Sequence, residues 1–235
     1  MESDSFKARL QRGFMVILNS RLLITIFTYN ALFASTTTLL SFQRAELVAS
    51  QRSDTSAESH TAFLASINVA SSLAVMVLQA SGLGARLAHF LGMRGTLVLM
   101  PCVRLAGVTV LVAWFVITAG RPPQLAVFLV VDELTRVINM AVAKPVRESL
   151  WRGLSNEARY EAKPLVDTLA NRWGGGSAAF LVSATGFLLG TDGMIMGFPP
   201  TLVLVFSIAV WWAVTAFNLG SVRKKIDEEL IKKEQ

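Results

Sequence analysis

Long apolar runs alternate with short polar stretches along the whole chain. Six of these runs approach the length of a transmembrane helix: about 22–42, 61–83, 96–119, 124–143, 173–189 and 201–219. About 20 apolar residues in a helix cross the hydrocarbon core of a bilayer, which is about 30 Å thick. The pattern therefore predicts an all-α membrane protein whose six transmembrane helices occupy residues 21–219.

Two terminal segments flank these runs. Residues 1–20 are polar and basic at first, which indicates an amphipathic lead-in on the cytoplasmic membrane face, and residues 220–235 form a charged cytoplasmic tail with a helical pattern. The apolar region after the lead-in continues to about Phe42, which is too long for the hydrophobic core of a cleavable signal peptide. We therefore expect a first span there and not a removed leader.

The distribution of Lys and Arg predicts the orientation of the spans. These residues concentrate in the lead-in, around Arg86 and Arg94, after the fourth span and in the tail, whereas the turns at 120–123 and 197–200 contain Arg121 alone. Segments rich in Lys and Arg stay on the cytoplasmic side. We expect both termini in the cytoplasm, with three spans followed by three spans, as in one half of a major-facilitator-type bundle.

Composition narrows the class of protein. The 235 residues are 53% hydrophobic and 16% charged, against about 25% charged residues in soluble domains. The chain has a net charge of +6, and its Lys and Arg residues cluster between the apolar runs. This distribution is better explained by their role in orienting the spans in the membrane than by binding of a nucleic acid polymer. One cysteine and two histidines argue against a zinc site, and no catalytic motif of the common hydrolase or P-loop types occurs. We expect neither an enzyme nor a bound cofactor.

Charged side chains interrupt the fourth span. Asp132 and Arg136 are four residues apart, so they share a helix face and can pair, and Asn139 extends this face. Glu133 lies about 100° around the helix. Because charges at membrane depth are costly, they usually face a watery cavity or the interior of a bundle. The face lines a polar pathway, or its charges form a structural ion pair between helices; the first interpretation is favoured.

A basic segment follows at the expected cytoplasmic mouth. Pro145 can end or kink the helix, and Lys144 and Arg147 offer donors for an anionic group. On charge alone, ordinary cytoplasmic loop residues with an Arg147–Glu148 surface pair explain the segment better. Residues 157–163 have the pattern of an amphipathic cytoplasmic helix between the fourth and fifth spans. The small residues at 174–179 favour close helix packing in the fifth span.

Residues 144–150, which read Lys-Pro-Val-Arg-Glu-Ser-Leu, begin an ordered series of motifs. Arg-Tyr-Glu-Ala-Lys at 159–163, Val-Asp-Thr at 166–168 and Arg172 follow, and Phe-Gln-Arg-Ala-Glu at 42–46 precedes them. The series resembles the nucleotide (ATP/ADP) translocase group of the major facilitator superfamily, in its C-terminal six-helix half. Two features depart from the group: the acid of its Gly-Gly-Asp motif is missing, and the group has twelve spans.

The resemblance implies a membrane transporter, or half of one, that moves a small anionic solute, such as a nucleotide in exchange, by alternating access. Its partners would be the lipid bilayer, the solute and a second six-helix half. The alternative is a non-transporting membrane scaffold or a degenerate half of a carrier. Taken with the fourth span, the candidate substrate-binding residues are Asp132, Arg136, Asn139, Lys144, Arg147, Glu148, Lys163, Asp167 and Arg172.

Overall fold

A computed structural model of the chain describes residues 11, 13–51, 57–121, 124–151, 154, 160, 162–190, 195 and 199–234. The described part is helical and contains no β-strand, in agreement with the predicted all-α class. Its helices are α2 (Arg21–Gln51), α3 (Ala57–Ala80), α4 (Leu83–Ile117), α5 (Leu125–Ile138), the π-helical turn η1 (Asn139–Ala143), α6 (Lys144–Ser149), α7 (Lys163–Leu189) and α8 (Pro200–Glu234).

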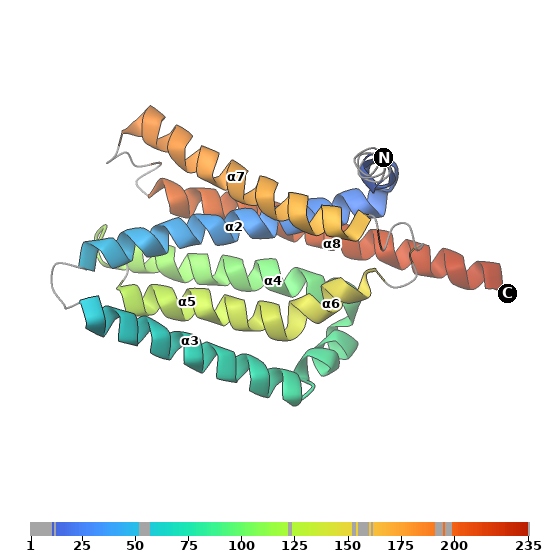
Figure 1. Ribbon diagram of the computed structural model, residues 1–235, viewed down its shortest axis with the longest axis horizontal. Coiled ribbons are helices and arrows are strands. Elements are labelled where there is room, and N and C mark those ends of the chain that lie inside the picture. Colours follow the sequence, from blue (N-terminus) through green and yellow to red (C-terminus); the bar gives the residue numbers. More distant parts are fainter. Residues whose placement is uncertain are drawn as a thin grey trace, which may run out of the picture.

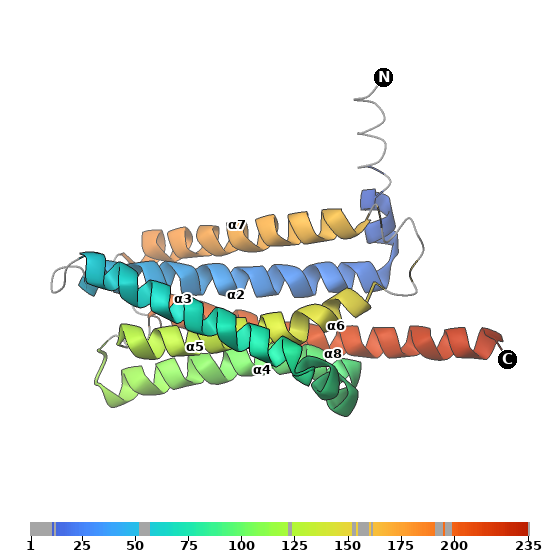
Figure 2. The ribbon, with the colours of Figure 1, turned by 60° about the horizontal axis from the view of Figure 1, so that its bottom comes forward.

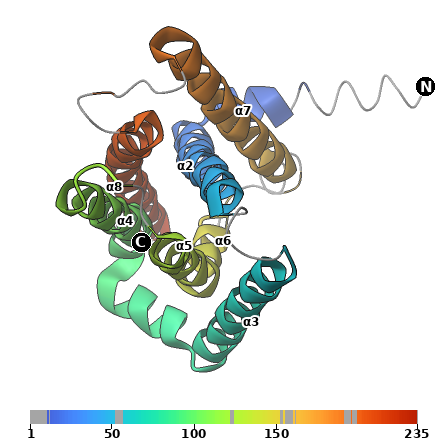
Figure 3. The ribbon, with the colours of Figure 1, turned by 90° about the vertical axis from the view of Figure 1, so that its left-hand side faces the viewer.

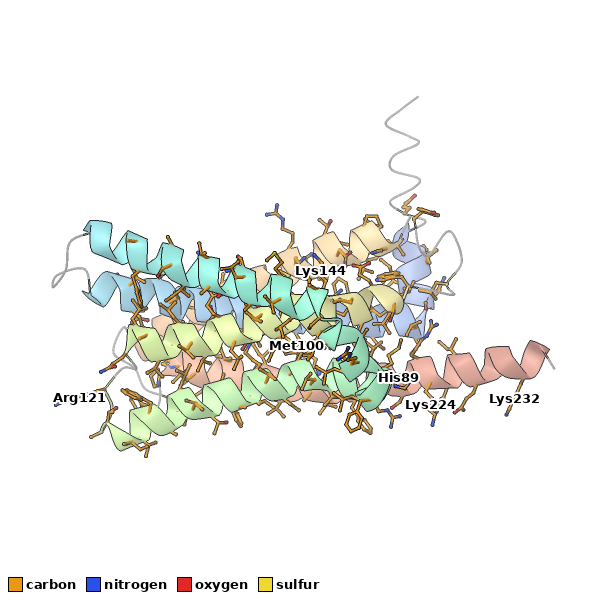
Figure 4. The ribbon with its side chains drawn as sticks, turned by 90° about the horizontal axis from the view of Figure 1, so that it is seen from below. His89, Met100, Arg121, Lys144, Lys224 and Lys232 are labelled. Atoms are coloured by element: carbon orange, nitrogen blue, oxygen red, sulfur yellow. The ribbon has the colours of Figure 1, made fainter. Side chains whose placement is uncertain are left out.

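Successive long helices run in opposite directions along the longest axis of the molecule, and α5, η1 and α6 follow one another as a single rod (Figures 1 and 2). We call the end where α2 and α4 begin the basic end. There α8 extends past the other helices, and Figure 4 shows Lys224 and Lys232 along this extension. Arg121 lies at the opposite end (Figure 4).

The core is built around α2. Viewed end-on, α2 lies between α7, α8 and the α5–α6 rod, while α3 lies at the edge (Figure 3). One apolar cluster, toward the basic end, centres on Trp212, whose ring lies 5.4 Å from that of Tyr29 between centroids. A second cluster includes Leu39, Phe128 and Val205. Together they fix α2, α4, α5 and α8 around the charged residues of the fourth predicted span.

Four helical segments are long and apolar enough to cross a membrane: Arg21–Ala49, Ala62–Ala80, Leu83–Ile117 and Pro200–Ile226. They correspond to the first, second, third and sixth predicted spans. The other two predicted spans are not among these four segments. In the fourth, α5 is 14 residues long and carries Asp132, Glu133 and Arg136, and in the fifth, α7 begins with a polar turn. The described residues therefore form an all-helical fold with four candidate spans, and the six-span count stays a prediction.

Several helices are longer than the apolar runs that predict them. The polar stretch from residue 43, which lies between the first two predicted spans, continues α2 as far as Gln51, and Gln43 and Leu47 in it are buried. α7 begins at Lys163, ten residues before the predicted start of the fifth span at 173, and α8 includes most of the charged tail. Most of the amphipathic helix predicted at 157–163, and half of the lead-in, lie outside the described residues.

Candidate functional site

The charges of α5 belong to a network that joins three helices. Arg104 of α4 places its Nη1 atom 3.4 Å from Asp132 Oδ1. Arg44 of α2 lies between the two carboxylates, with its Nη1 atom 3.9 Å from Asp132 Oδ2 and 3.6 Å from Glu133 Oε1. These contacts tie α2 and α4 to α5. They lie between η1 and the end of the molecule that is opposite the basic end. With Arg136 they form what we call the span cluster.

Asp132 and Arg136, whose spacing allows an ion pair, have other partners in the described part of the chain. Arg136 Nη1 lies 3.4 Å from Glu133 Oε2, and it also donates to Asn68 Oδ1 of α3 at 2.7 Å. Asp132 is turned to the cations of α2 and α4. Glu133 lies three residues before Arg136, and residues with this spacing are neighbours on a helix surface, so these two can pair. A shared helix face thus allowed the predicted pair, but the neighbouring helices determined the partners.

The span cluster contains three guanidinium groups and two carboxylates. Its most deeply buried member is Arg104, which is 3% exposed and also donates from Nη2 to Thr37 Oγ1 at 3.4 Å. A charge this far from water requires a nearby opposite charge to be tolerated. The cluster can therefore hold α2, α4 and α5 together as long as its ion pairs are intact.

The π turn η1 positions the second group of polar side chains. Pro145 has no N–H, and its ring crowds the carbonyl of the preceding turn, so a regular α-helix cannot continue through it. The backbone widens to the π form over Asn139–Ala143 instead, and Gln79 Nε2 of α3 donates to Met140 O at 3.1 Å. Such π turns are frequent at functional sites. Pro145, which was expected to end or kink the helix, lies in the first turn of α6, and the π turn ends one residue before Lys144.

A polar cavity of about 320 Å³ lies beside this turn, between α2, the α5–α6 rod and α7. Arg147 projects at its wall and donates to Asn30 Oδ1 at 3.3 Å and to Asn139 Oδ1 at 3.2 Å. Its guanidinium carbon also lies 5.1 Å from the ring centroid of Phe33. We call this space the Arg147 cavity; it is lined by Ile26, Asn30, Phe33, Asn139, Met140, Lys144, Arg147, Glu148, Trp151, Asp167 and Asn171.

The predicted site residues divide into two groups and one outlier. Asn139, Lys144, Arg147, Glu148 and Asp167 line the Arg147 cavity. Lys163 adjoins it through an ion pair with Glu148, which replaces the predicted Arg147–Glu148 surface pair. Asp132 and Arg136 belong to the span cluster instead. Arg172 is exposed and is not among the residues that line the cavity.

Several site residues were not predicted. Asn30 and Phe33 reach the Arg147 cavity from α2, and Arg44 and Arg104 complete the span cluster. For Arg104 a signal existed, because a charge inside an apolar run is itself a marker of a functional or structural pair. Asn30 and Phe33 gave no comparable signal. In the described part of the chain, no group of three or more His, Cys, Asp or Glu side chains could hold a metal ion.

Asp167, in the first turns of α7, supports a prediction about pH. Burial raises the pKa of this carboxyl above its usual 3.8; Lys163 lowers it, Glu148 raises it and Arg147 lowers it, in decreasing order of effect. The folded protein thus binds this proton more tightly than the unfolded chain, so stability is lost as pH rises from about 3.8 through the folded pKa. We expect Asp167→Asn to raise the melting temperature relative to the wild type at pH 7, with the difference vanishing toward pH 4.

Melting temperatures of both proteins between pH 4 and pH 7 would check this prediction. Glu228→Gln is a suitable control, since its carboxylate is largely exposed near the end of α8 and its ion-pair partner among the described residues is Lys224. A variant Asp167→Asn that is less stable than the wild type at pH 7 would show that the ionised carboxylate stabilises the fold.

Comparisons of the chain with protein-family models, with curated proteins and with solved structures find no match.

Proposed function

We propose that the chain is a six-helix half of a secondary transporter that moves a small anionic solute. The observation that carries this proposal is the setting of Arg147 in its cavity. Its guanidinium contacts the neutral amides of Asn30 and Asn139, and within the described residues it forms no ion pair. An arginine held in place by amides keeps its positive charge available for a carboxylate or phosphate, which it can bind through two parallel hydrogen bonds.

The other charges of the cavity are consistent with an anionic guest. Lys144 is exposed at the wall and adds a second cation, whereas the carboxylate of Glu148 is already occupied by Lys163. Burial raises the pKa of Asp167, which favours the neutral form of this carboxyl group. A volume of about 320 Å³ lies at the lower end of the range for ligand pockets. It suits a small anion or the phosphate part of a larger solute.

The span cluster supplies the second element that alternating access needs. Along the α5–α6 rod, the span cluster lies before η1, and Arg147 lies after η1, nearer the basic end. We infer that its ion pairs close the path toward the opposite end while the cavity is open toward the basic end. Opening on the other side would require α2 and α4 to separate from α5, with a second six-helix half forming the other wall.

The resemblance of residues 144–172 to the nucleotide translocase group supports a nucleotide among anionic solutes, and the Lys and Arg pattern supports a cytoplasmic position for both termini. A second candidate function is a membrane scaffold without transport. It is favoured by the internal pairing of the span cluster, since ion pairs that only lock helices together require no ligand.

Uptake by proteoliposomes distinguishes the two functions. The purified chain would be tested with radiolabelled ADP and, separately, with inorganic phosphate inside and outside the vesicles. We expect Arg147→Gln to reduce uptake about 10- to 100-fold, because one or two charge-assisted hydrogen bonds to the solute are lost. Arg172→Gln removes the same charge outside the cavity and should transport like the wild type.

Uptake of either probe that falls equally in both variants would show that Arg147 has no specific role. No uptake by the wild-type chain, with the protein folded, inserted and dimeric so that a second six-helix half is present, would favour the scaffold. The thermal stability of each variant in detergent would identify losses that arise from unfolding.

A further inference from the structure

A second polar cavity, of about 780 Å³, lies at the basic end between the start of α2 and the later turns of α8. It has no lining residue in common with the Arg147 cavity. Its charged lining residues are Arg21 and Lys225, and the amides of Asn19 and Asn218 add further hydrogen-bonding groups. We call it the α2–α8 cavity.

The polar lining comes from one face of each helix. On α2 the face consists of Arg21, Thr25 and Thr28, and on α8 Asn218 and Lys225 are separated by two turns. Thr25 Oγ1 donates to the Arg21 carbonyl at 2.7 Å, and the other hydroxyls of the two faces are likewise used within their own helices. The cations and amides are therefore the donors that remain for a guest.

The positive charge of the α2–α8 cavity is not balanced from within. Among the described residues, no carboxylate lines it, and neither Arg21 nor Lys225 forms an ion pair. The adjacent Lys224, by contrast, lies outside the cavity and pairs with Glu228 at 3.7 Å. A cavity with two cations and no acid attracts an anion, and a phosphate accepts hydrogen bonds from both ammonium and guanidinium groups.

The position of the cavity identifies the source of that anion. Two candidate spans terminate at it: the first begins at Arg21 and the last ends at Ile226, and both residues line the cavity. α2 and α8 pack side by side (Figure 3), so the cavity lies at the level where two neighbouring spans leave the hydrocarbon core. Leu22, Ile24 and Val222 add apolar walls that acyl chains can contact.

We propose that the α2–α8 cavity binds a phosphate group, and that the headgroup of an anionic phospholipid supplies it. Basic pockets between membrane helices on the cytoplasmic side are suited to such headgroups. Binding there would clamp the start of α2 to α8 without involving the Arg147 cavity. The proposal thus stands whether or not the protein transports a solute.

Lipid-dependent thermal stability of the full chain in detergent tests the proposal. Melting temperatures would be recorded while phosphatidylglycerol, phosphatidylcholine or inorganic phosphate is added. We expect phosphatidylglycerol to raise the melting temperature and phosphatidylcholine to have little effect. In the double variant Arg21→Gln/Lys225→Gln the apparent affinity for phosphatidylglycerol should fall about 30-fold, because two cations near the headgroup are removed.

Two further variants separate a site from general surface charge. Lys224→Gln removes a neighbouring lysine outside the cavity and should retain the response, and Arg21→Lys/Lys225→Arg should largely restore it because both charges are kept. Equal responses to the two lipids, or a double variant that responds like the wild type, would overturn the site. If inorganic phosphate raises the melting temperature and neither lipid does, and the double variant loses this response, the phosphate site would be supported and its assignment to lipid overturned.

Discussion

Replacing Arg104 with alanine is expected to lower the free energy of unfolding by about 3–5 kcal/mol, the usual cost of removing one partner of a buried ion pair. Arg104 is 3% exposed, and the side chain of Asp132 is 20% exposed. Without Arg104, Asp132 keeps only the longer contact of 3.9 Å to Arg44. The loss would also remove a link between α4 and α5 at a depth where few waters can replace it.

Arg136 provides the matched control. It belongs to the same cluster and pairs with Glu133 at 3.4 Å, but its side chain is 50% exposed. Exposed ion pairs contribute about 1 kcal/mol or less, so Arg136→Ala should have a much smaller effect. Unfolding by sodium dodecyl sulfate in mixed micelles would measure both. Equal losses in the two variants would contradict a special role for burial.

A double substitution tests whether the charge itself or the volume matters at this position. Arg104→Leu/Asp132→Leu removes both members of the pair and fills the space with apolar atoms. Replacing both partners of a buried ion pair by apolar residues is often nearly neutral. We therefore expect the double variant to be more stable than Arg104→Ala. A double variant that is at least as unstable would show that other contacts of Arg104, such as the one to Thr37, dominate.

The charges of the fourth span illustrate what the sequence could predict about the site. The cost of charges among apolar residues predicts that Asp132 and Arg136 face a watery cavity or the interior of a bundle, and in the structure both belong to the span cluster. Their partners could not be derived, because Arg44 and Arg104 come from α2 and α4, and sequence spacing does not determine how helices pack. Local geometry favoured Asp132–Arg136, and tertiary contacts selected other pairs.

The end of the first predicted span, at about residue 42, shows a second limit. Polar composition suggested a loop, yet Gln43, Arg44 and Glu46 are good helix formers, and nothing between them and Gln51 breaks a helix. The continuation of α2 brings Arg44 to the carboxylates of α5. Polarity alone therefore misplaced the end of α2 and concealed a member of the site.

The candidate residues after the fourth predicted span lie closer together. Pro145 marked the point where the regular helix must change, and the π turn before it brings Asn139 within reach of Arg147. The candidates at 144–148 therefore gather at one cavity. Asn30 and Phe33, which complete the wall, lie more than a hundred residues earlier on α2, and only the packing of α2 beside the rod connects them.

The triple glycine of α7 supports the remaining large prediction. A Cβ on Gly174 would collide with the carbonyl oxygen of Ala31 and lie 2.9 Å from the Cβ of Ala34, so the backbones of α2 and α7 could not stay as close. Ser35 Oγ also donates to the Gly174 carbonyl at 2.9 Å, and this hydrogen bond depends on the same approach. The close packing predicted from the small residues is thus present at this glycine.

We expect Gly174→Ala to destabilise the protein by about 1–3 kcal/mol, the usual cost of overpacking. The neighbouring glycines form a graded control: a Cβ on Gly175 would lie 3.3 Å from Thr38 Oγ1, a side chain that can move, and a Cβ on Gly176 would meet nothing within 4 Å. Gly176→Ala should be neutral or stabilising by up to about 1 kcal/mol, because alanine favours the helix. Unfolding in mixed micelles should rank Gly174→Ala below Gly175→Ala and Gly176→Ala. The reverse order would mean that α2 and α7 are not in this close contact in the membrane.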